Sequence, residues 1–196
     1  TLNECPYYIH DFVFLGDIGF GFSEFPEAEF YSLLTERSSK YFWIIQGNHD
    51  NALRMQDGNN FTSVTTFKGS MLLNLNNVPT LLIPGALSFD KNLRVPDVSW
   101  WENEEMTQSY LQATLDKSSS AKVILSHDAP LQQYLQFFGQ TTPSKTNRMM
   151  DVMYSELMKS EVSKTWIHGH LHRNYSEVRN NLTLIGLGSN TNWTVI

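Results

Sequence analysis

The chain has 196 residues, a length typical of one globular domain that can bury a sizeable core. Its hydrophobic content of 41% and charged content of 17% exclude a disordered chain. The formal net charge of −6, from 14 Lys and Arg against 20 Asp and Glu, disfavours nonspecific binding to nucleic acid or to an anionic membrane surface. We therefore expect a single domain over residues 1–196.

Cys5 is the single cysteine, which excludes a disulfide within the chain and gives no support for secretion. No apolar run approaches the roughly 18 residues that a membrane helix requires, and the chain does not start with a basic-then-apolar signal peptide. We expect a cytoplasmic protein without a membrane partner, and composition does not indicate its oligomeric state.

Short apolar runs alternate with segments of helical spacing, which predicts an α/β fold. In chain order we expect a strand at 12–15, a helix at 24–36 capped by Ser23, a strand at 41–45, a turn-rich stretch at 57–70, and strands at 71–75 and 80–83. There follow a helix at 101–117, a strand at 122–125, helices at 130–138 and 144–159, a strand at 165–167, and a hairpin of strands at 175–178 and 182–185.

Four polar blocks each follow an apolar run. They are Gly16-Asp17, Gly47-Asn48-His49-Asp50, Ser126-His127-Asp128 and Gly169-His170-Leu171-His172. Because α/β folds gather their ligands at the carboxyl ends of strands, we expect these blocks to meet in one cleft. A carboxylate, a carboxamide oxygen and several imidazoles are donors that suit Mn, Fe, Zn or Ni. The residues therefore predict a metal-dependent hydrolase.

The order of these blocks resembles that of the calcineurin-like metallophosphoesterases, over roughly residues 12 to 187. The resemblance implies a four-layer α/β/β/α sandwich with a site for two divalent metal ions between the sheet edges. It also implies hydrolysis of a phosphomonoester or phosphodiester by a metal-bound hydroxide, without a covalent phospho-enzyme. The substrate would be a small phosphate ester or a nucleotide.

The resemblance also assigns the metal ligands. Asp17 would bridge both metals, and Asn48, His127 and His170 would complete the shell of the second one. His172 would bind the first metal. His168, which is adjacent to this block, is expected to face the opposite way or to lie behind the ligands.

His49 and Asp50 are the catalytic candidates that the resemblance implies. His49 would stay off the metals and would donate a proton to the leaving group or stabilise its negative charge. Asp50 would form a hydrogen bond to His49 and so fix its tautomer.

The chain departs from the family pattern at its first metal site. Relatives begin with an Asp-x-His block on an earlier strand, and nothing before Asp17 forms one. His10 and Asp11 cannot replace it, because adjacent strand residues point to opposite faces. We expect that the N-terminal strand is missing from this chain, with residues 1–8 left from the next helix and loop. The alternative is a member that has lost this metal site.

Two further segments bear on the subfamily. The stretch 16–21 lacks the additional Asp and the Arg-Gly that mark the protein Ser/Thr phosphatases. The stretch 84–94, followed by Trp100-Trp101, resembles a segment of small bacterial and phage-type members. There Lys91 and Arg94 could contact a substrate phosphate. The interpretation that we favour is that Asp90 pairs with Arg94 to hold the loop and that the tryptophans cap the core.

Two alternatives to a general phosphoesterase remain. One is a nucleotide phosphodiesterase or nuclease. The other is a degenerate protein that binds a phosphate or a partner without turnover, which the incomplete first metal site supports. Substrate choice would depend on the loops at 51–70, 84–104 and 131–148, which carry no motif for a particular substrate.

Overall fold

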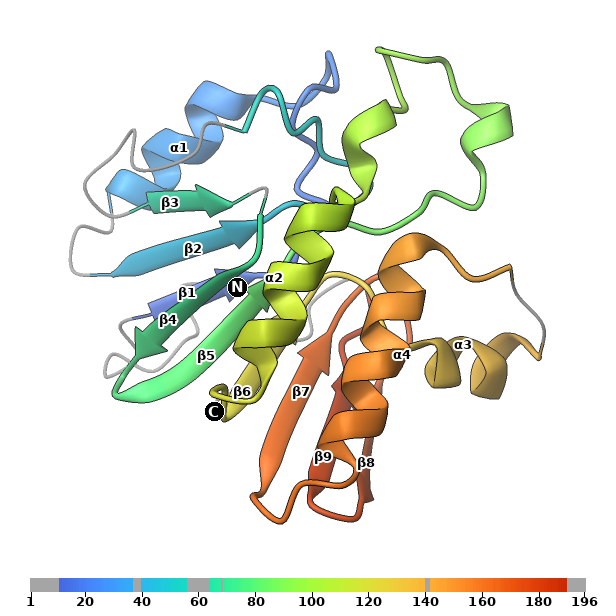
Figure 1. The fold of residues 1–196 in the computed structure, drawn as a ribbon. Helices are drawn as coiled ribbons and strands as arrows, with labels where there is room; N and C mark the ends of the chain where they lie inside the picture. The colour runs from blue at the N-terminus through green and yellow to red at the C-terminus, as the bar shows by residue number, and fades with distance from the viewer. Residues whose placement is uncertain (1–10, 37–39, 56–63, 68, 140–141, 190–196) are drawn as a thin grey trace.

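The computed structural model describes residues 11–36, 40–55, 64–67, 69–139 and 142–189 (Figure 1). The strands are β1 (Asp11–Phe14), β2 (Tyr41–Ile45), β3 (Val64–Phe67), β4 (Met71–Leu75), β5 (Val78–Ile83), β6 (Val123–Ser126), β7 (Lys164–His168), β8 (Tyr175–Arg179) and β9 (Leu182–Gly186). The α-helices are α1 (Glu27–Thr35), α2 (Gln108–Ser118), α3 (Leu131–Phe138) and α4 (Lys145–Leu157), and short 3₁₀ turns lie at η2 (Lys91–Leu93) and η3 (Glu102–Glu104).

The strands form two sheets. The smaller sheet has the order β1-β2-β3 and is parallel throughout. The larger sheet has the order β4-β5-β6-β7-β9-β8, in which β5, β6, β7 and β9 are parallel and an antiparallel strand lies at each edge. Parallel strands carry their carboxyl ends to the same edge of a sheet, so the residues that follow β1, β2, β6 and β7 can gather there.

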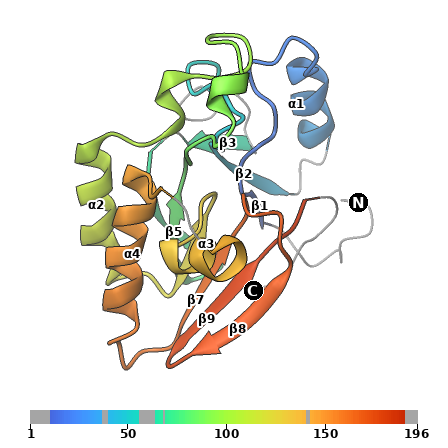
Figure 2. The same ribbon diagram turned by 90° about the vertical axis from the view of Figure 1, so that its right-hand side faces the viewer.

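Three apolar clusters separate four layers. Leu34 of α1 and Phe42 of β2 belong to a cluster on the outer face of the smaller sheet. Ile45 and Leu82 belong to a second cluster between the two sheets. A third, around Trp166, lies under α2 and α4, which run side by side over the outer face of the larger sheet (Figure 2). The predicted α/β/β/α sandwich is therefore confirmed.

Several predicted strands agree with the structure, and one strand was missed. The strands at 41–45 and 71–75 have the predicted bounds, and β8 and β9 form the predicted antiparallel hairpin. The stretch 57–70, predicted as turns, contains β3. The polar hydroxyls of Thr65 and Thr66 hid this strand from the hydrophobic pattern, although β-branched side chains favour strands.

Two predicted helices start later than expected. The first begins at Glu27, directly after Pro26, and the side chain of Ser23 does not cap it. Proline is well suited to the start of a helix, because its φ is already close to the helical value. The segment predicted as a helix from 101 contains η3, and α2 starts only at Gln108. Tertiary contacts override helix propensity here, since the carbonyl of Glu104 accepts a hydrogen bond from the N–H of Ala86.

The predicted N-terminal remnant at 1–8, and His10 with it, lie outside the described residues. Among the described helices, none is both long enough and apolar enough to cross a membrane.

Candidate metal centre and active site

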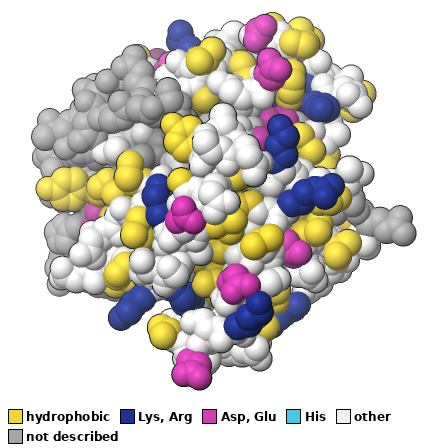
Figure 3. Space-filling view, viewed as in Figure 1, with side chains coloured by type: hydrophobic (Ala, Val, Ile, Leu, Met, Phe, Trp, Pro, Cys, Tyr) yellow, Lys and Arg dark blue, Asp and Glu magenta, His cyan; other side chains and the backbone are white. Residues whose placement is uncertain are grey.

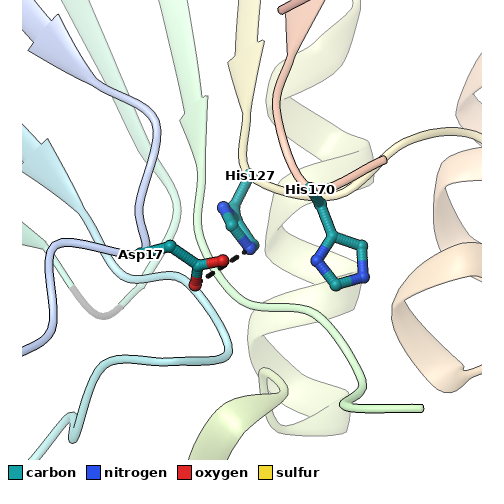
Figure 4. Close-up of side chains that lie close together, drawn as sticks. All are labelled: Asp17, His127 and His170. Atoms are coloured by element: carbon teal, nitrogen blue, oxygen red, sulfur yellow. Dashed lines mark ion pairs between the residues drawn. The ribbon is translucent and has the colours of Figure 1, made fainter. Parts of the chain in front are cut away.

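Four predicted metal ligands lie at the carboxyl ends of strands from both sheets. Asp17 follows β1, Asn48 follows β2, His127 follows β6 and His170 follows β7. The ligand atoms of Asp17, His127 and His170 all lie within 4.8 Å of one another, and these three side chains converge (Figure 4). The two sheets therefore bring together residues that are up to 153 positions apart in the sequence (170 − 17).

The hydrogen bonds of His127 leave one ring nitrogen facing oxygen atoms. Its Nδ1 lies 2.5 Å from the carbonyl oxygen of Leu15, to which it donates. Its Nε2 lies 2.9 Å from Oδ1 of Asn48 and 3.4 Å from Oδ1 of Asp17. In the neutral ring this Nε2 carries a lone pair, so three electron-rich atoms face one another. A cation between these atoms would accept a lone pair from each of them. The hydrogen bond from Nδ1 to the Leu15 carbonyl would fix the orientation of the ring, as is common for histidines that bind metals.

His170 carries a second indication of a cation. Its Nε2 is buried and finds no hydrogen-bond partner among the described residues. Burial, with a further contribution from His127, lowers the pKa of His170 to about 3. The ring is therefore neutral at ordinary pH, which is the form that binds a metal. The donor types and the neutral ring, whose Nδ1 faces His127 (Figure 4), fit a divalent ion.

The backbone at the candidate ligands is strained. Asp17, His170 and His172 have φ values of 57°, 56° and 52°, in the left-handed region that residues other than glycine rarely adopt. Such angles persist where the surrounding structure imposes them, and they are frequent at functional sites. Gly47 leaves no room for a side chain, since a Cβ there would lie 2.2 Å from Oδ1 of Asp17.

The Asp17 carboxylate is held in its charged form. Burial by itself raises its pKa, but the nearby His127 and a hydrogen bond from the backbone N–H of His49 lower it by more, so the net shift is downward. That N–H lies 2.9 Å from Oδ1 of Asp17. A carboxylate in this state is suited to binding a cation.

The predicted hydrogen bond from Asp50 to the His49 ring is wrong. Oδ1 of Asp50 accepts the backbone N–H groups of Gly19 and Phe20, at 2.7 and 3.1 Å, and Oδ2 accepts that of Gly47, at 2.9 Å. The carboxylate is completely buried, and this burial raises its pKa despite the hydrogen bonds. Asp50 therefore joins the loop that carries Asp17 to the loop that carries Asn48, because both loops turn N–H donors toward it.

The ring of His49 contacts an arginine instead. Nη2 of Arg94 lies 2.7 Å from Nε2 of His49, and the ring of Phe22 stacks beside it with centroids 6.3 Å apart. Burial lowers the pKa of His49; Asp17 opposes this shift and the guanidinium of Arg94 reinforces it. The ring is therefore held neutral at the edge of the candidate metal centre.

The loop at 84–104 shows the ion pair that we favoured. Nε of Arg94 lies 2.7 Å from Oδ1 of Asp90, four residues earlier. Lys91 is exposed, with Nζ 5.9 Å from the centroid of the Trp100 ring, and Trp101 is buried. The predicted pair of Asp90 and Arg94 is thus confirmed, whereas Trp100 is only half-buried and neither tryptophan belongs to a core cluster of the described residues.

Two further histidines of the described residues, His168 and His172, lie outside the cluster. His172 is exposed and is not among the converging ligands of the described residues. His168 is fully buried, and its ring nitrogens contact the hydroxyl of Tyr175 and the carbonyl of Gly169. As expected, His168 is not one of the converging ligands of the described residues.

Several supporting groups were not predicted. The side-chain nitrogen of Asn48 lies 3.0 Å from Oγ of Ser88 and donates to it, which directs the other end of the amide toward His127. Ser88 belongs to the stretch 84–94, which resembles a segment of small bacterial and phage-type members of the family. The carbonyl of Leu15 that orients His127 has no signal in the sequence, because every residue has a carbonyl.

A model of the calcineurin-like phosphoesterase family matches residues 7–174. This match spans most of the chain, which therefore belongs to that family, whose members hydrolyse phosphoesters with divalent metal ions. A comparison with curated proteins found no match.

Proposed function

We propose that this chain, as a single domain over residues 1–196, hydrolyses a phosphomonoester or phosphodiester with the help of two divalent metal ions. Asp17, Asn48, His127 and His170 would hold metal, with His172 as a further ligand. The convergence of three of these side chains within 4.8 Å is the observation that carries the proposal. Divalent ions at such a site supply positive charge to the phosphoryl oxygens and lower the pKa of water. The oxygen and nitrogen donors suit Mn, Fe, Zn or Ni.

His49 is the proposed catalytic residue of the protein itself. Its ring lies beside the metal centre, and its backbone N–H holds the Asp17 carboxylate. A leaving-group oxygen gains negative charge as its bond to phosphorus breaks, so a hydrogen bond or proton from this ring would stabilise it. Asp50 acts as a positioning residue, because its carboxylate fixes the loop that carries His49 and does not contact the ring.

The substrate class is a small phosphate ester or a nucleotide, and a nucleotide phosphodiesterase is the alternative within the same chemistry. On the face of the molecule shown in Figure 3, Lys and Arg side chains lie among acidic and apolar ones. Arg94 is a basic group that contacts His49 at the edge of the candidate site.

The test is hydrolysis of nitrophenyl phosphate and bis-nitrophenyl phosphate with added manganese and with a chelator. We expect metal-dependent turnover that falls about 100- to 10,000-fold in His49→Ala, the range for loss of an acid–base group. His127→Ala should in addition lose manganese binding, measured by calorimetry. Lys145→Ala, an exposed change on α4, is the control. Turnover that survives chelation would contradict the proposal, and manganese binding without turnover would favour the non-catalytic alternative.

A further inference from the structure

Arg94 is fixed so that one end of its guanidinium faces the candidate site. Nε donates to Oδ1 of Asp90 at 2.7 Å, and Nη1 donates to the carbonyl of Ser99 at 2.9 Å. These two bonds, on different edges of a planar group, determine its orientation. The side chain is only 12% exposed, whereas that of Asp90 is 49% exposed. The orientation therefore exists before any ligand binds.

The His49 ring has too few acceptor atoms for the N–H donors of Nη2. A guanidinium has five N–H donors, and the two anchoring bonds occupy one on Nε and one on Nη1. Nη2 faces the ring of His49, at 2.7 Å from Nε2 and 3.3 Å from Nδ1. Nη1 also lies 3.3 Å from Nδ1 of His49. A neutral imidazole has one acceptor nitrogen, so the N–H donors beside the ring outnumber its acceptors. Phosphoryl oxygens are stronger acceptors for such donors, and arginine matches their geometry.

We propose that Arg94 makes this site selective for phosphomonoesters, by binding a nonbridging oxygen of a terminal phosphate beside His49. This inference depends on the proposed function. A terminal phosphate has three nonbridging oxygens and up to two negative charges. A diester has two such oxygens and one charge, and its second substituent removes an acceptor. A fixed cationic donor therefore contributes more to binding the monoester than the diester.

The apolar neighbours of His49 strengthen this preference. Phe22 lies on the ring of His49 and makes an edge contact with Trp101, at 5.0 Å between centroids. The Phe22 ring offers no hydrogen bond to a phosphoryl oxygen, and the indole N–H of Trp101 is buried. An oxygen on this side of the site would therefore depend on Arg94 and His49 for its donors.

The test compares Arg94→Gln, Arg94→Lys and a matched control, Arg54→Gln, in manganese-loaded protein. Arg54 also pairs with a carboxylate, that of Glu27, but its side chain is 62% exposed. Steady-state rates on nitrophenyl phosphate and bis-nitrophenyl phosphate give KM and kcat for each ester. Calorimetric titration with inorganic phosphate gives a dissociation constant that does not depend on turnover.

We expect Arg94→Gln to raise KM for the monoester and the dissociation constant for phosphate by about 10- to 100-fold, as for loss of hydrogen bonds to a charged group. KM for the diester should rise by less than about threefold. Any change in kcat should be the same for both esters, because Arg94 contacts His49 whichever ester is bound. Arg94→Lys should recover part of the loss, and Arg54→Gln should resemble the wild type. An equal rise in KM for both esters, or unchanged phosphate binding, would overturn the inference.

Failure of the proposed function has a different signature. In that case the wild type hydrolyses neither ester, while the phosphate titration still reports on Arg94. Thermal unfolding of each variant identifies any loss that comes from misfolding, and Arg94→Lys retains the charge if Arg94→Gln is unstable.

Discussion

Asp50→Asn is the change that should most directly loosen the loop that carries Asn48 and His49. The substitution keeps the size of the side chain and one oxygen, which can still accept the N–H groups of Gly19 and Phe20. It replaces the oxygen that faces the N–H of Gly47 with an amide nitrogen. Two donors then face each other in a completely buried place.

The cost follows from the bond that is lost. A hydrogen bond to a charged group contributes about 1.5–3 kcal/mol. Removing the buried charge offsets part of this loss in stability, because burial raises the pKa of Asp50 and so disfavours the carboxylate. We expect a net loss of about 2 kcal/mol in the free energy of unfolding. For a domain of this length that lowers Tm by about 4–8 °C.

Urea denaturation in the presence of a chelator measures this loss without a contribution from bound metal. Asp116→Asn is the matched control, since Asp116 is exposed and its carboxylate accepts a hydrogen bond from the side chain of Gln112 on α2. The control should lie within about 0.5 kcal/mol of the wild type. Manganese binding should also weaken in Asp50→Asn, because the loop that carries Asn48 loses its internal hydrogen bond at Gly47. Equal stability of the two variants would refute the reasoning.

Three further predictions concern packing, capping and pH. Gly47→Ala should lose manganese binding in calorimetry because its Cβ would overlap the Asp17 carboxylate, whereas Gly169→Ala, with its nearest atom at 3.6 Å, should retain it. Lys164→Met should cost about 1–3 kcal/mol in urea denaturation, because its buried ammonium binds backbone carbonyls at the end of α2, and the exposed Lys122→Met should cost far less. Burial raises the pKa of Asp128 to about 7, so the folded state holds its proton more tightly than the unfolded state, where the pKa is about 3.9. In metal-free protein, the contribution of Asp128 to the free energy of unfolding should be greatest below about pH 4 and should decline up to about pH 7. Asp128→Asn should show a smaller decline.

Much of the fold follows from local pattern. The apolar runs at 41–45 and 71–75 predicted β2 and β4 with their bounds, because a buried strand needs apolar side chains whatever its neighbours are. Elements whose residues are polar or whose ends depend on contacts were predicted less well. The strand β3 and the start of α2 at Gln108 are examples.

The candidate site divides in the same way. The sequence by itself determined which side chains can bind a metal, since residue type limits donor chemistry, and it placed them after strands. Tertiary structure alone decided their partners. The carboxylate of Asp50 meets N–H groups about 30 positions away, and Arg94 meets His49 across 45 positions. Such contacts depend on how the two sheets pack and where the loops cross, and no spacing along the chain encodes that geometry.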